Sequence, residues 1–372
     1  MAMPNKLEEQ RKQLVDKIVA DMEAGKAFFW EPGYTAHRMV NAVTGKPYRG
    51  GNAISLMAAS EAKGYDDPRW CTFNQAKENG WHVKKGEKGI PIEVWKAYDI
   101  IKDEENVPEG EEPEKERRFW RVAGYTVFNA KQIDGIPAMP ERSAEEIEAE
   151  RKKQIAELEL LIKNSEAEIF HDQTAKNFYR KTDDTIHVIA PEKFDSIDHY
   201  YATVTHEIAH STGAEKRLGR DLRGTFGQPD YAKEELRAEM ASMFIQQEYN
   251  IRFDEKHYEN HAAYLTSWAQ VLKRDPNELY RAARDAEKAV DYMKSRMIER
   301  DLQKEETKEK AVQMPAPAER EVAKEAVTAK TTPQERPKHN IQRSIEIKPR
   351  KRRVVARRSP AKERGRERTL SR

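Results

Sequence analysis

The sequence predicts an α+β protein in which an N-terminal α+β domain and a mostly helical C-terminal domain are followed by a disordered basic tail. Three observations support this prediction. Two runs with strand-like alternation lie in the N-terminal third, helical patterns dominate residues 143–300, and apolar spacing is lost from about residue 304 onward. The length of 372 residues suits two domains with extensions. The predicted boundaries are 1–140 and 166–300 for the two domains, 141–165 for a charged helical connector and 301–372 for the tail.

Composition limits the classes to which the chain can belong. Hydrophobic residues make up 37% and charged residues 35% of the chain, so part of it is expected to stay solvated. The N-terminus has no apolar segment of the kind found in secretory signals, and no run of 18 apolar residues is present. The single cysteine, Cys71, excludes a disulfide framework and a cysteine-rich zinc site. We therefore expect a cytoplasmic protein with no membrane partner; its oligomeric state is not indicated.

The N-terminal half is predicted to contain short helices and a β-hairpin. Apolar residues at helical spacing, a cap at Thr72 and glycine stop signals predict helices over about residues 6–25, 53–63 and 72–78. Alternating residues at 91–98 and 119–128 predict two strands. Residues 101–118 between them are nearly all charged and include two prolines, so we expect an exposed hairpin loop there.

The C-terminal half is predicted to be mainly helical. A charged helical pattern covers 143–163, and further helical patterns cover 257–273 and 276–300. Two short strands are predicted at 177–181 and 185–189. The last 32 residues, 341–372, hold 13 Lys or Arg and 3 Asp or Glu, a net charge of 13 − 3 = +10. Such a tail can bind nucleic acid without sequence preference, or can serve only to keep the chain soluble.

The segment His206-Glu207-Ile208-Ala209-His210 has the H-E-x-x-H pattern of zinc peptidases. On a helix, His206 and His210 lie one above the other and can reach the same metal ion. Glu207 lies about 100° around the helix, beside the metal position. The opposite face holds Ile197, Tyr201, Val204 and Ile208. The segment therefore predicts a helix with one apolar face toward a core and one face toward a metal.

A zinc site needs a third protein ligand and one open position. Glu235 and Glu239 share one face of a second helical pattern downstream. We expect Glu235 to be the third ligand, with Glu234 as the alternative. Glu239, one turn further on, is expected to accept a hydrogen bond from a ligand histidine and orient it.

The N-terminal domain combines tryptophan and basic residues. Five of the six tryptophans lie before residue 121, interspersed with lysine and arginine. Proteins that bind single strands pair cationic grooves with aromatic faces on which bases stack. The alternative is that these tryptophans form the core of a small domain. The residues we expect to contact DNA are Tyr48, Arg49, Asn52, Trp70, Trp81, Lys84, Lys85 and Lys88.

Two sets of ordered motifs resemble one family, the ArdC-type antirestriction proteins of plasmids and conjugative elements. The N-terminal set is Thr44-Gly45-Lys46-Pro47-Tyr48-Arg49-Gly50, Trp70-Cys71-Thr72-Phe73-Asn74-Gln75-Ala76-Lys77 and His82-Val83-Lys84-Lys85-Gly86-Glu87-Lys88-Gly89. The C-terminal set is the H-E-x-x-H segment with Ser211-Thr212-Gly213, and Tyr231-Ala232-Lys233-Glu234-Glu235-Leu236-Arg237-Ala238-Glu239. Gly51 departs from the aliphatic residue expected there.

This resemblance, which covers about residues 5–300, implies a single-stranded-DNA-binding domain followed by a zincin-like metallopeptidase domain. It implies a cytoplasmic antirestriction function on transferred DNA. In the expected mechanism, His206, His210 and Glu235 hold Zn²⁺, a water takes the fourth position, and Glu207 transfers its proton to the leaving amine of a protein or peptide substrate. Residues 185–189 are expected to pair with an extended peptide as an added strand.

Two alternatives remain. In one, the protein coats incoming single strands and its zincin-like domain is structural and non-catalytic. In the other, the protein is a conjugation or primase-associated DNA-binding protein, because it also resembles the N-terminal part of plasmid primases.

Overall fold

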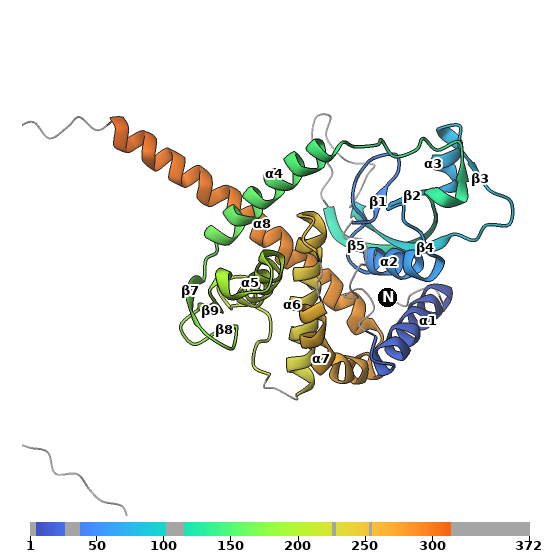
Figure 1. Cartoon of the computed structure of the whole chain (residues 1–372). Coiled ribbons are helices and arrows are strands. Elements are labelled where there is room, and N and C mark those ends of the chain that lie inside the picture. The colour runs from blue at the N-terminus through green and yellow to red at the C-terminus, as the bar shows by residue number, and fades with distance from the viewer. Residues whose placement is uncertain (1–4, 27–37, 102–114, 225–227, 253–254, 314–372) are drawn as a thin grey trace, which may run out of the picture. The chain divides into compact units, whose positions relative to one another are not determined.

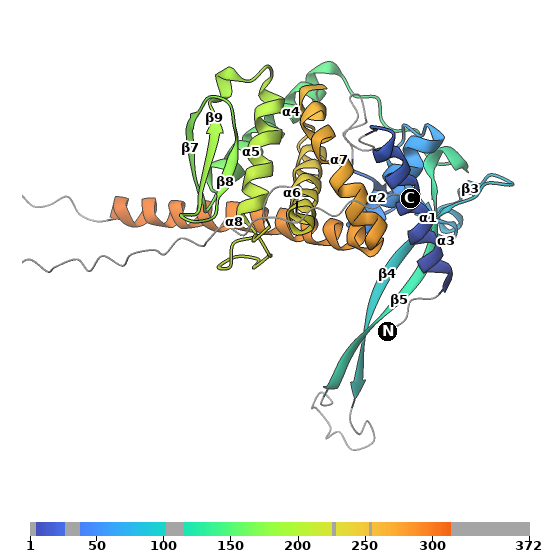
Figure 2. The ribbon, with the colours of Figure 1, turned by 90° about the horizontal axis from the view of Figure 1, so that it is seen from below.

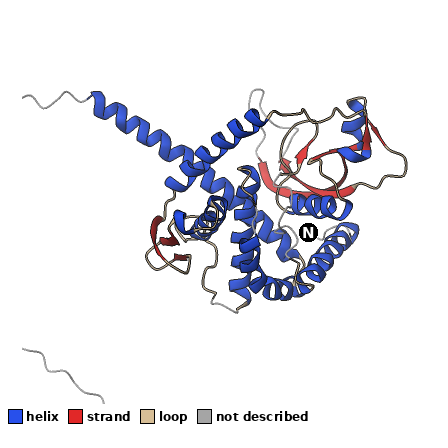
Figure 3. Cartoon of the chain, in the orientation of Figure 1, coloured by secondary structure: helices blue, strands red, loops and turns tan. Residues whose placement is uncertain are grey.

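A computed structural model of the chain describes residues 5–26, 38–101, 115–224, 228–252 and 255–313 (Figure 1). Strands and short helices dominate its N-terminal half, and helices dominate its C-terminal half (Figure 3). This confirms the predicted α+β class and the order of two domains. Of the predicted disordered tail, residues 301–313 instead form the end of helix α8, and residues 314–372 lie outside the described residues. Among the described helices, none has both the length and the apolar character needed to cross a bilayer.

The N-terminal half is built on a four-stranded sheet with the order β1-β2-β5-β4. Strands β1 and β2 are parallel, and the other neighbours are antiparallel. Thr72 caps α3 by accepting from Gln75 N, as predicted, and Gln75 accepts a bond from the Thr72 backbone. The elements are α1 (Asn5–Glu23), β1 (Val40–Asn41), α2 (Gly51–Lys63), β2 (Arg69–Thr72), α3 (Phe73–Glu78), β3 (His82–Val83), β4 (Ile90–Ile101), β5 (Lys115–Asn129) and β6 (Ile133–Asp134).

Strands β4 and β5 form the predicted hairpin. They pair in antiparallel register from Ile90↔Val127 to Ile101↔Lys115, and Figure 2 shows them running together away from the helices. The structure therefore confirms the two predicted strands and makes both longer than expected. Most of the predicted charged loop, residues 102–114, lies outside the described residues.

The described residues of the C-terminal half form five α-helices, one short 3-10 helix (Pro191–Lys193) and a small sheet with the order β7-β9-β8. Strand β7 was not expected from the sequence; it pairs parallel to β9, so β9 is the central strand. Helix α8 continues beyond the predicted end at residue 300. The elements are α4 (Ala144–Lys163), β7 (Glu168–Gln173), β8 (Phe178–Arg180), β9 (Thr185–Ile189), α5 (Ile197–Ser211), α6 (Pro229–Glu248), α7 (Glu255–Arg274) and α8 (Asn277–Gln313).

One apolar cluster joins the two halves. It contains Ile54 and Trp70 from the N-terminal half and Phe244 and Trp268 from the C-terminal half, all fully buried. Helix α8 contacts α2 as well as α4, α5, α6 and α7. The two predicted domains therefore share a core, and the boundaries proposed at residues 140 and 165 stay a prediction.

Polar contacts between the loop before α2 and helix α8 add to this apolar packing between the two halves. Arg49 pairs with Glu287 at 3.0 Å and with Asp291 at 2.6 Å. Arg38 also pairs with the buried carboxylate of Glu287. Gly50 adopts a left-handed φ of 56°, and its N–H donates to Glu287 at 3.2 Å. The loop is thus held to α8 by side chains and by backbone.

We predict that Gly51→Ala destabilises the protein by about 1–3 kcal/mol, the usual cost of overpacking. A Cβ atom at Gly51 would lie 2.2 Å from Cδ1 of the Tyr280 ring on α8, so the ring or the helix must move. Chemical denaturation measures the free energy of unfolding. The control is Gly124→Ala, because the added methyl group there meets only Leu7 Cδ1 at 3.8 Å. Equal stability of the two variants would contradict the prediction.

Candidate metal centre

Helix α5 presents the two histidines of the H-E-x-x-H segment. Ser196 caps its N-terminus by accepting from His199 N at 3.0 Å. Val204, Ile208 and Ala209 are buried in the apolar cluster, which fixes the rotation of the helix. The predicted apolar face is therefore present at Tyr201, Val204 and Ile208, and the histidines point away from it. Ile197, at the first position of the helix, is 48% exposed and does not join this face.

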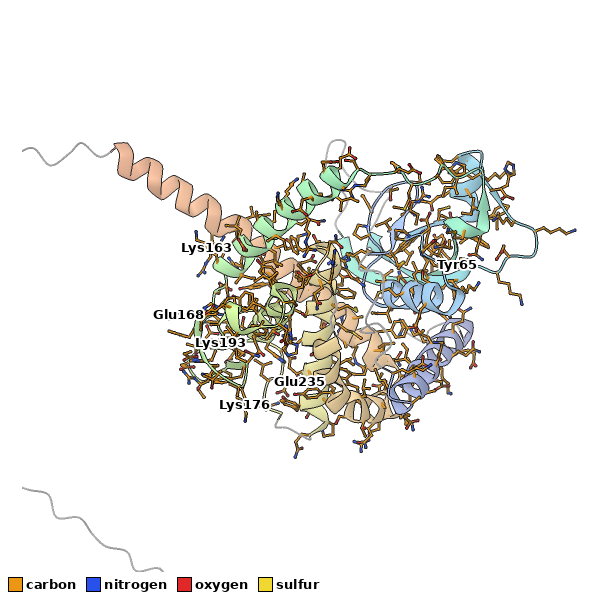
Figure 4. All side chains as sticks on the ribbon, in the orientation of Figure 1. Tyr65, Lys163, Glu168, Lys176, Lys193 and Glu235 are labelled. Atoms are coloured by element: carbon orange, nitrogen blue, oxygen red, sulfur yellow. The ribbon has the colours of Figure 1, made fainter. Side chains whose placement is uncertain are left out.

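Helix α6 crosses α5 at a pair of small hydroxyl side chains. Ser242 Oγ donates to Ala202 O at 2.8 Å and lies 3.1 Å from Thr205 Oγ1. All three residues are buried, so the two backbones approach closely without a large side chain between them. This contact brings the acidic face of α6, including Glu235 (labelled in Figure 4), against the histidines of α5.

Three possible ligand groups converge between these helices. The Nε2 atoms of His206 and His210 lie 3.0 Å apart. The carboxylate of Glu235 lies 3.7 Å from His206 Nε2 and 3.5 Å from His210 Nε2. Metal–ligand bonds of roughly 2.0–2.2 Å in a four-coordinate site separate neighbouring donor atoms by about 3.4 Å. The donor set therefore fits a small divalent cation, as its residue types predict.

The outer nitrogen of each imidazole faces another carboxylate. Glu239 Oε1 lies 3.1 Å from His206 Nδ1, the position predicted for it. Glu234 Oε1 lies 3.4 Å from His210 Nδ1 and is itself bound by Arg220 at 2.8 Å. Both carboxylates can hold an Nδ1 proton, which leaves Nε2 for a metal. This arrangement places Glu234, the alternative ligand, in an orienting position instead.

The surroundings of the imidazoles favour positive charge. Burial opposes protonation of His206, but the carboxylate of Glu239 outweighs burial and raises the pKa of His206 to about 9. Burial likewise opposes protonation of His210, and Glu235 and Glu234 together raise its pKa well above the usual value. The same attraction lowers the pKa of Glu234 and Glu235 despite their burial. A buried centre with this excess of carboxylates has a negative potential, which suits a bound cation.

Glu207 is buried beside the histidines and lines the same cavity. Burial raises the pKa of its carboxyl group, an effect that His206 and His210 partly oppose. The backbone N–H of Tyr179, on β8, donates a hydrogen bond to this carboxylate. A basic carboxylate held by the edge of a strand is therefore adjacent to the candidate metal ligands.

The cavity over the site has a volume of about 490 Å³ and is bordered by β8. In the small sheet, β8 is an edge strand, whereas β9 is paired on both sides. The expectation that residues 185–189 accept a peptide strand is therefore wrong, because their backbone groups are already used. The open strand beside the cavity is β8.

Two tyrosines at this cavity were missed by the sequence analysis. Tyr231 on α6 donates a hydrogen bond to Glu235, and its hydroxyl lies 3.5 Å from that of Tyr264 on α7. Burial and the Glu235 charge raise the pKa of both hydroxyls, so they stay protonated donors. Tyr231 lies one helical turn before Glu235, a spacing that could have revealed it. No local pattern indicates Tyr264.

Three of the residues expected to contact DNA have structural roles. Trp70 is 0% exposed, so the prediction that it stacks on a base is wrong. Tyr48 is half-buried; it donates to Trp70 O at 3.2 Å, and burial raises its pKa to about 12. Asn52 makes two hydrogen bonds to the backbone of Glu93, at 2.7 and 2.8 Å, which tie α2 to β4.

The other expected DNA contacts are more accessible. Arg49 is half exposed, although Glu287 and Asp291 bind it. Trp81 is partly buried against a small cluster around Cys71 and Ile133. The lysines of the basic turn, Lys84, Lys85 and Lys88, are exposed. Contact between these residues and DNA stays a prediction.

Comparisons with known proteins match both halves. A zincin-like metallopeptidase family matches residues 156–285, and the N-terminal domain of anti-restriction factor ArdC matches residues 8–128. Crystal structures of the antirestriction protein ArdC from plasmid R388, one metal-free and one Mn(II)-bound, are 30% and 31% identical to this chain. Their TM-scores are 0.60 and 0.59; the matches cover 78% and 77% of this chain and 98% and 97% of that protein.

Curated sequences give a second kind of relative. Two DNA primases named TraC from Escherichia coli are 40% identical over 301 and 294 residues, which is 76% and 75% of this chain. This chain spans only 27% and 19% of their length. An uncharacterised protein, y4eC of Sinorhizobium fredii, is 35% identical over 76% of this chain and 90% of its own length.

We predict that Glu235→Ala and Glu234→Ala differ in their effect on metal binding. Loss of Glu235 removes one of three converging donors and should lower affinity for Zn²⁺ or Mn²⁺ by more than about 100-fold. Loss of Glu234 removes only an orienting contact and should cost about 10–100-fold. Competition with a chelator measures both affinities. The opposite ranking would make Glu234 the ligand.

Proposed function

This chain belongs to the ArdC-type antirestriction proteins, and from this premise we propose that it binds single-stranded DNA and is a metal-dependent peptidase. The observation that carries the peptidase proposal is the convergence of His206, His210 and Glu235 next to Glu207, in a cavity bordered by an open strand. A structural metal site needs neither a basic carboxylate beside the metal position nor an open cleft.

We propose that the ligands are His206, His210 and Glu235 and that the metal in the cell is Zn²⁺. Two imidazoles and one carboxylate are a ligand set typical of catalytic zinc. The R388 protein has a Mn(II)-bound structure, so a related protein accepts another divalent ion. When bound, such an ion acts as a Lewis acid toward a carbonyl group and increases the acidity of water.

In the proposed reaction, Glu207 accepts the proton of the attacking water and delivers it to the amine of the leaving peptide. Glu239 and Glu234 keep the imidazole rings oriented through their Nδ1 atoms. The hydroxyl of Tyr264, and that of Tyr231 once it turns from Glu235, can donate to the oxyanion that develops on the substrate. An extended peptide lies in the cavity between β8 and the candidate ligands, next to Glu207.

The DNA-binding proposal rests on the N-terminal domain. Its accessible basic groups include Lys84, Lys85 and Lys88 in the turn between β3 and β4. Cations at an exposed turn can follow a phosphate backbone and release condensed counterions. In this proposal, binding to transferred single strands protects the DNA from restriction in the cytoplasm.

A second candidate function is that of a DNA-binding module associated with conjugation or priming, in which the zincin-like domain is structural. The observation that favours it is the 40% identity with a segment of the TraC primases. In that case a metal stabilises the crossing of α5 and α6, and antirestriction does not depend on Glu207.

We predict that Glu207→Gln keeps metal affinity but lowers the rate of peptide cleavage by about 10²–10⁴-fold, the usual contribution of a general base. The glutamine side chain would preserve the volume of the original one but could not accept a proton. Metal content and cleavage of a quenched-fluorescent peptide library measure the two properties separately. Cleavage at the wild-type rate would exclude the proposed mechanism, and retention of antirestriction without cleavage would favour the structural alternative.

We predict that replacing Lys84, Lys85 and Lys88 with glutamine weakens binding to single-stranded DNA and reduces the slope of log K against log salt by about 2, because three phosphate contacts are lost. Fluorescence anisotropy across a salt series provides the measurement. The matched control replaces Lys152, Lys153 and Lys193 with glutamine, which removes the same charge from exposed positions outside the turn. If both triple variants reduce the salt slope by the same amount, the turn between β3 and β4 has no special role in DNA binding.

A further inference from the structure

We propose that the groove between β4, the loop before α2 and helix α8 is a second contact region for single-stranded DNA, in which a base stacks on Trp95 and the phosphates lie along the basic face of α8. The proposal deepens the DNA-binding function proposed above and rests on it. It assigns a ligand to a cavity with a volume of about 770 Å³ that neither the metal centre nor the basic turn uses.

The groove is formed by segments far apart in the sequence. One wall contains Arg49 and Gly50 from the loop before α2, together with Gly51, the first residue of α2. Trp95 of β4 also lines the groove, and the opposite wall is the first half of α8. These segments are held together by the ion pair between Arg49 and Glu287 and by the close packing of Gly51 against Tyr280. A ligand would therefore meet a preformed surface.

The accessible charges of the groove are mostly positive. Arg284 and Lys288 are each 59% exposed, and Arg281 and Arg49 are 39% and 47% exposed. The acidic residues of the groove are less available: Glu287 and Glu93 are largely buried in ion pairs, and only Asp291 is widely exposed among the described lining residues. Four accessible cations and one accessible carboxylate complement a chain of phosphates.

Two of these cations lack a full counter-charge. Arg284 and Lys288 both contact the same carboxylate, Asp285, at 3.1 and 3.4 Å. Arg237 of α6 also contacts Asp285, at 3.3 Å. Arg237 is also bound by Glu278, and Arg281 is bound by Glu278 and Asp275. Because four cations in this network face three carboxylates, the exposed face of α8 keeps one positive charge that a phosphate can neutralise.

Trp95 provides the aromatic surface. It is 52% exposed, which is unusual for tryptophan, and it borders the same groove as the cations. Aromatic rings beside cations bind single strands because every base has a face that can stack. In a duplex these faces are already stacked on their neighbours, so the groove favours a single strand.

The test uses the full chain and fluorescein-labelled oligothymidylate in a salt series. We expect Trp95→Ala to weaken binding by about fivefold or more, as loss of one stacking platform does, and Trp95→Phe to restore much of it. Arg284→Gln with Lys288→Gln should lower the salt slope by about 1–1.5. The control, Lys152→Gln with Lys153→Gln on α4, removes the same charge from exposed positions and should bind like the wild type.

The outcomes separate this inference from the proposed function. If the wild type binds the oligonucleotide and both groove variants bind equally well, the groove inference is wrong while DNA binding stands. If the wild type does not bind single-stranded DNA at all, the proposed function fails and the inference fails with it. Equal weakening of duplex and single-strand binding by Trp95→Ala would overturn the choice of a single strand. Thermal unfolding of each variant shows whether a loss comes from the groove or from misfolding.

Discussion

The candidate metal centre depends on how closely α5 and α6 approach each other. At their crossing, Ser242 contacts the Ala202 carbonyl and the Thr205 hydroxyl, and no large side chain separates the backbones. The imidazoles and Glu207 belong to α5, and the other three carboxylates around the imidazoles belong to α6. A larger side chain at the crossing would separate the two halves of the site. Packing thus holds the site together, because carboxylates buried this close to one another repel unless a cation lies between them.

Much of this centre is local in sequence and was therefore predictable. The spacing of His206 and His210, and that of Glu235 and Glu239, follows from helical periodicity alone. Tyr264 could not be found in this way, because it reaches the cavity from α7 and no motif links it to α5. The central position of β9 was missed for a related reason: β7 is a polar strand with mostly exposed side chains, and it gives no apolar alternation.

The predicted DNA contacts in the N-terminal half include a buried tryptophan, because amino-acid composition does not show which side chains are buried. Tryptophan beside arginine suits both a core and a nucleic-acid surface. Trp70 is inside because the fold packs it against Tyr65 and Met39, which sequence composition does not show. The partners of Arg49 lie more than 200 residues away on α8. The segment around Arg49, which was expected to contact DNA, therefore also attaches helix α8, and this leaves only part of the segment accessible to a ligand.

Helix α8 has a consequence for how such proteins can be recombined in evolution. Because it packs against both halves, a gene fusion that carried only one of them would expose apolar surface and leave Glu287 without its arginines. The segments shared with the TraC primases are long enough to include both halves. The two halves thus form one structural unit, and a segment of matching length lies within the longer TraC polypeptides.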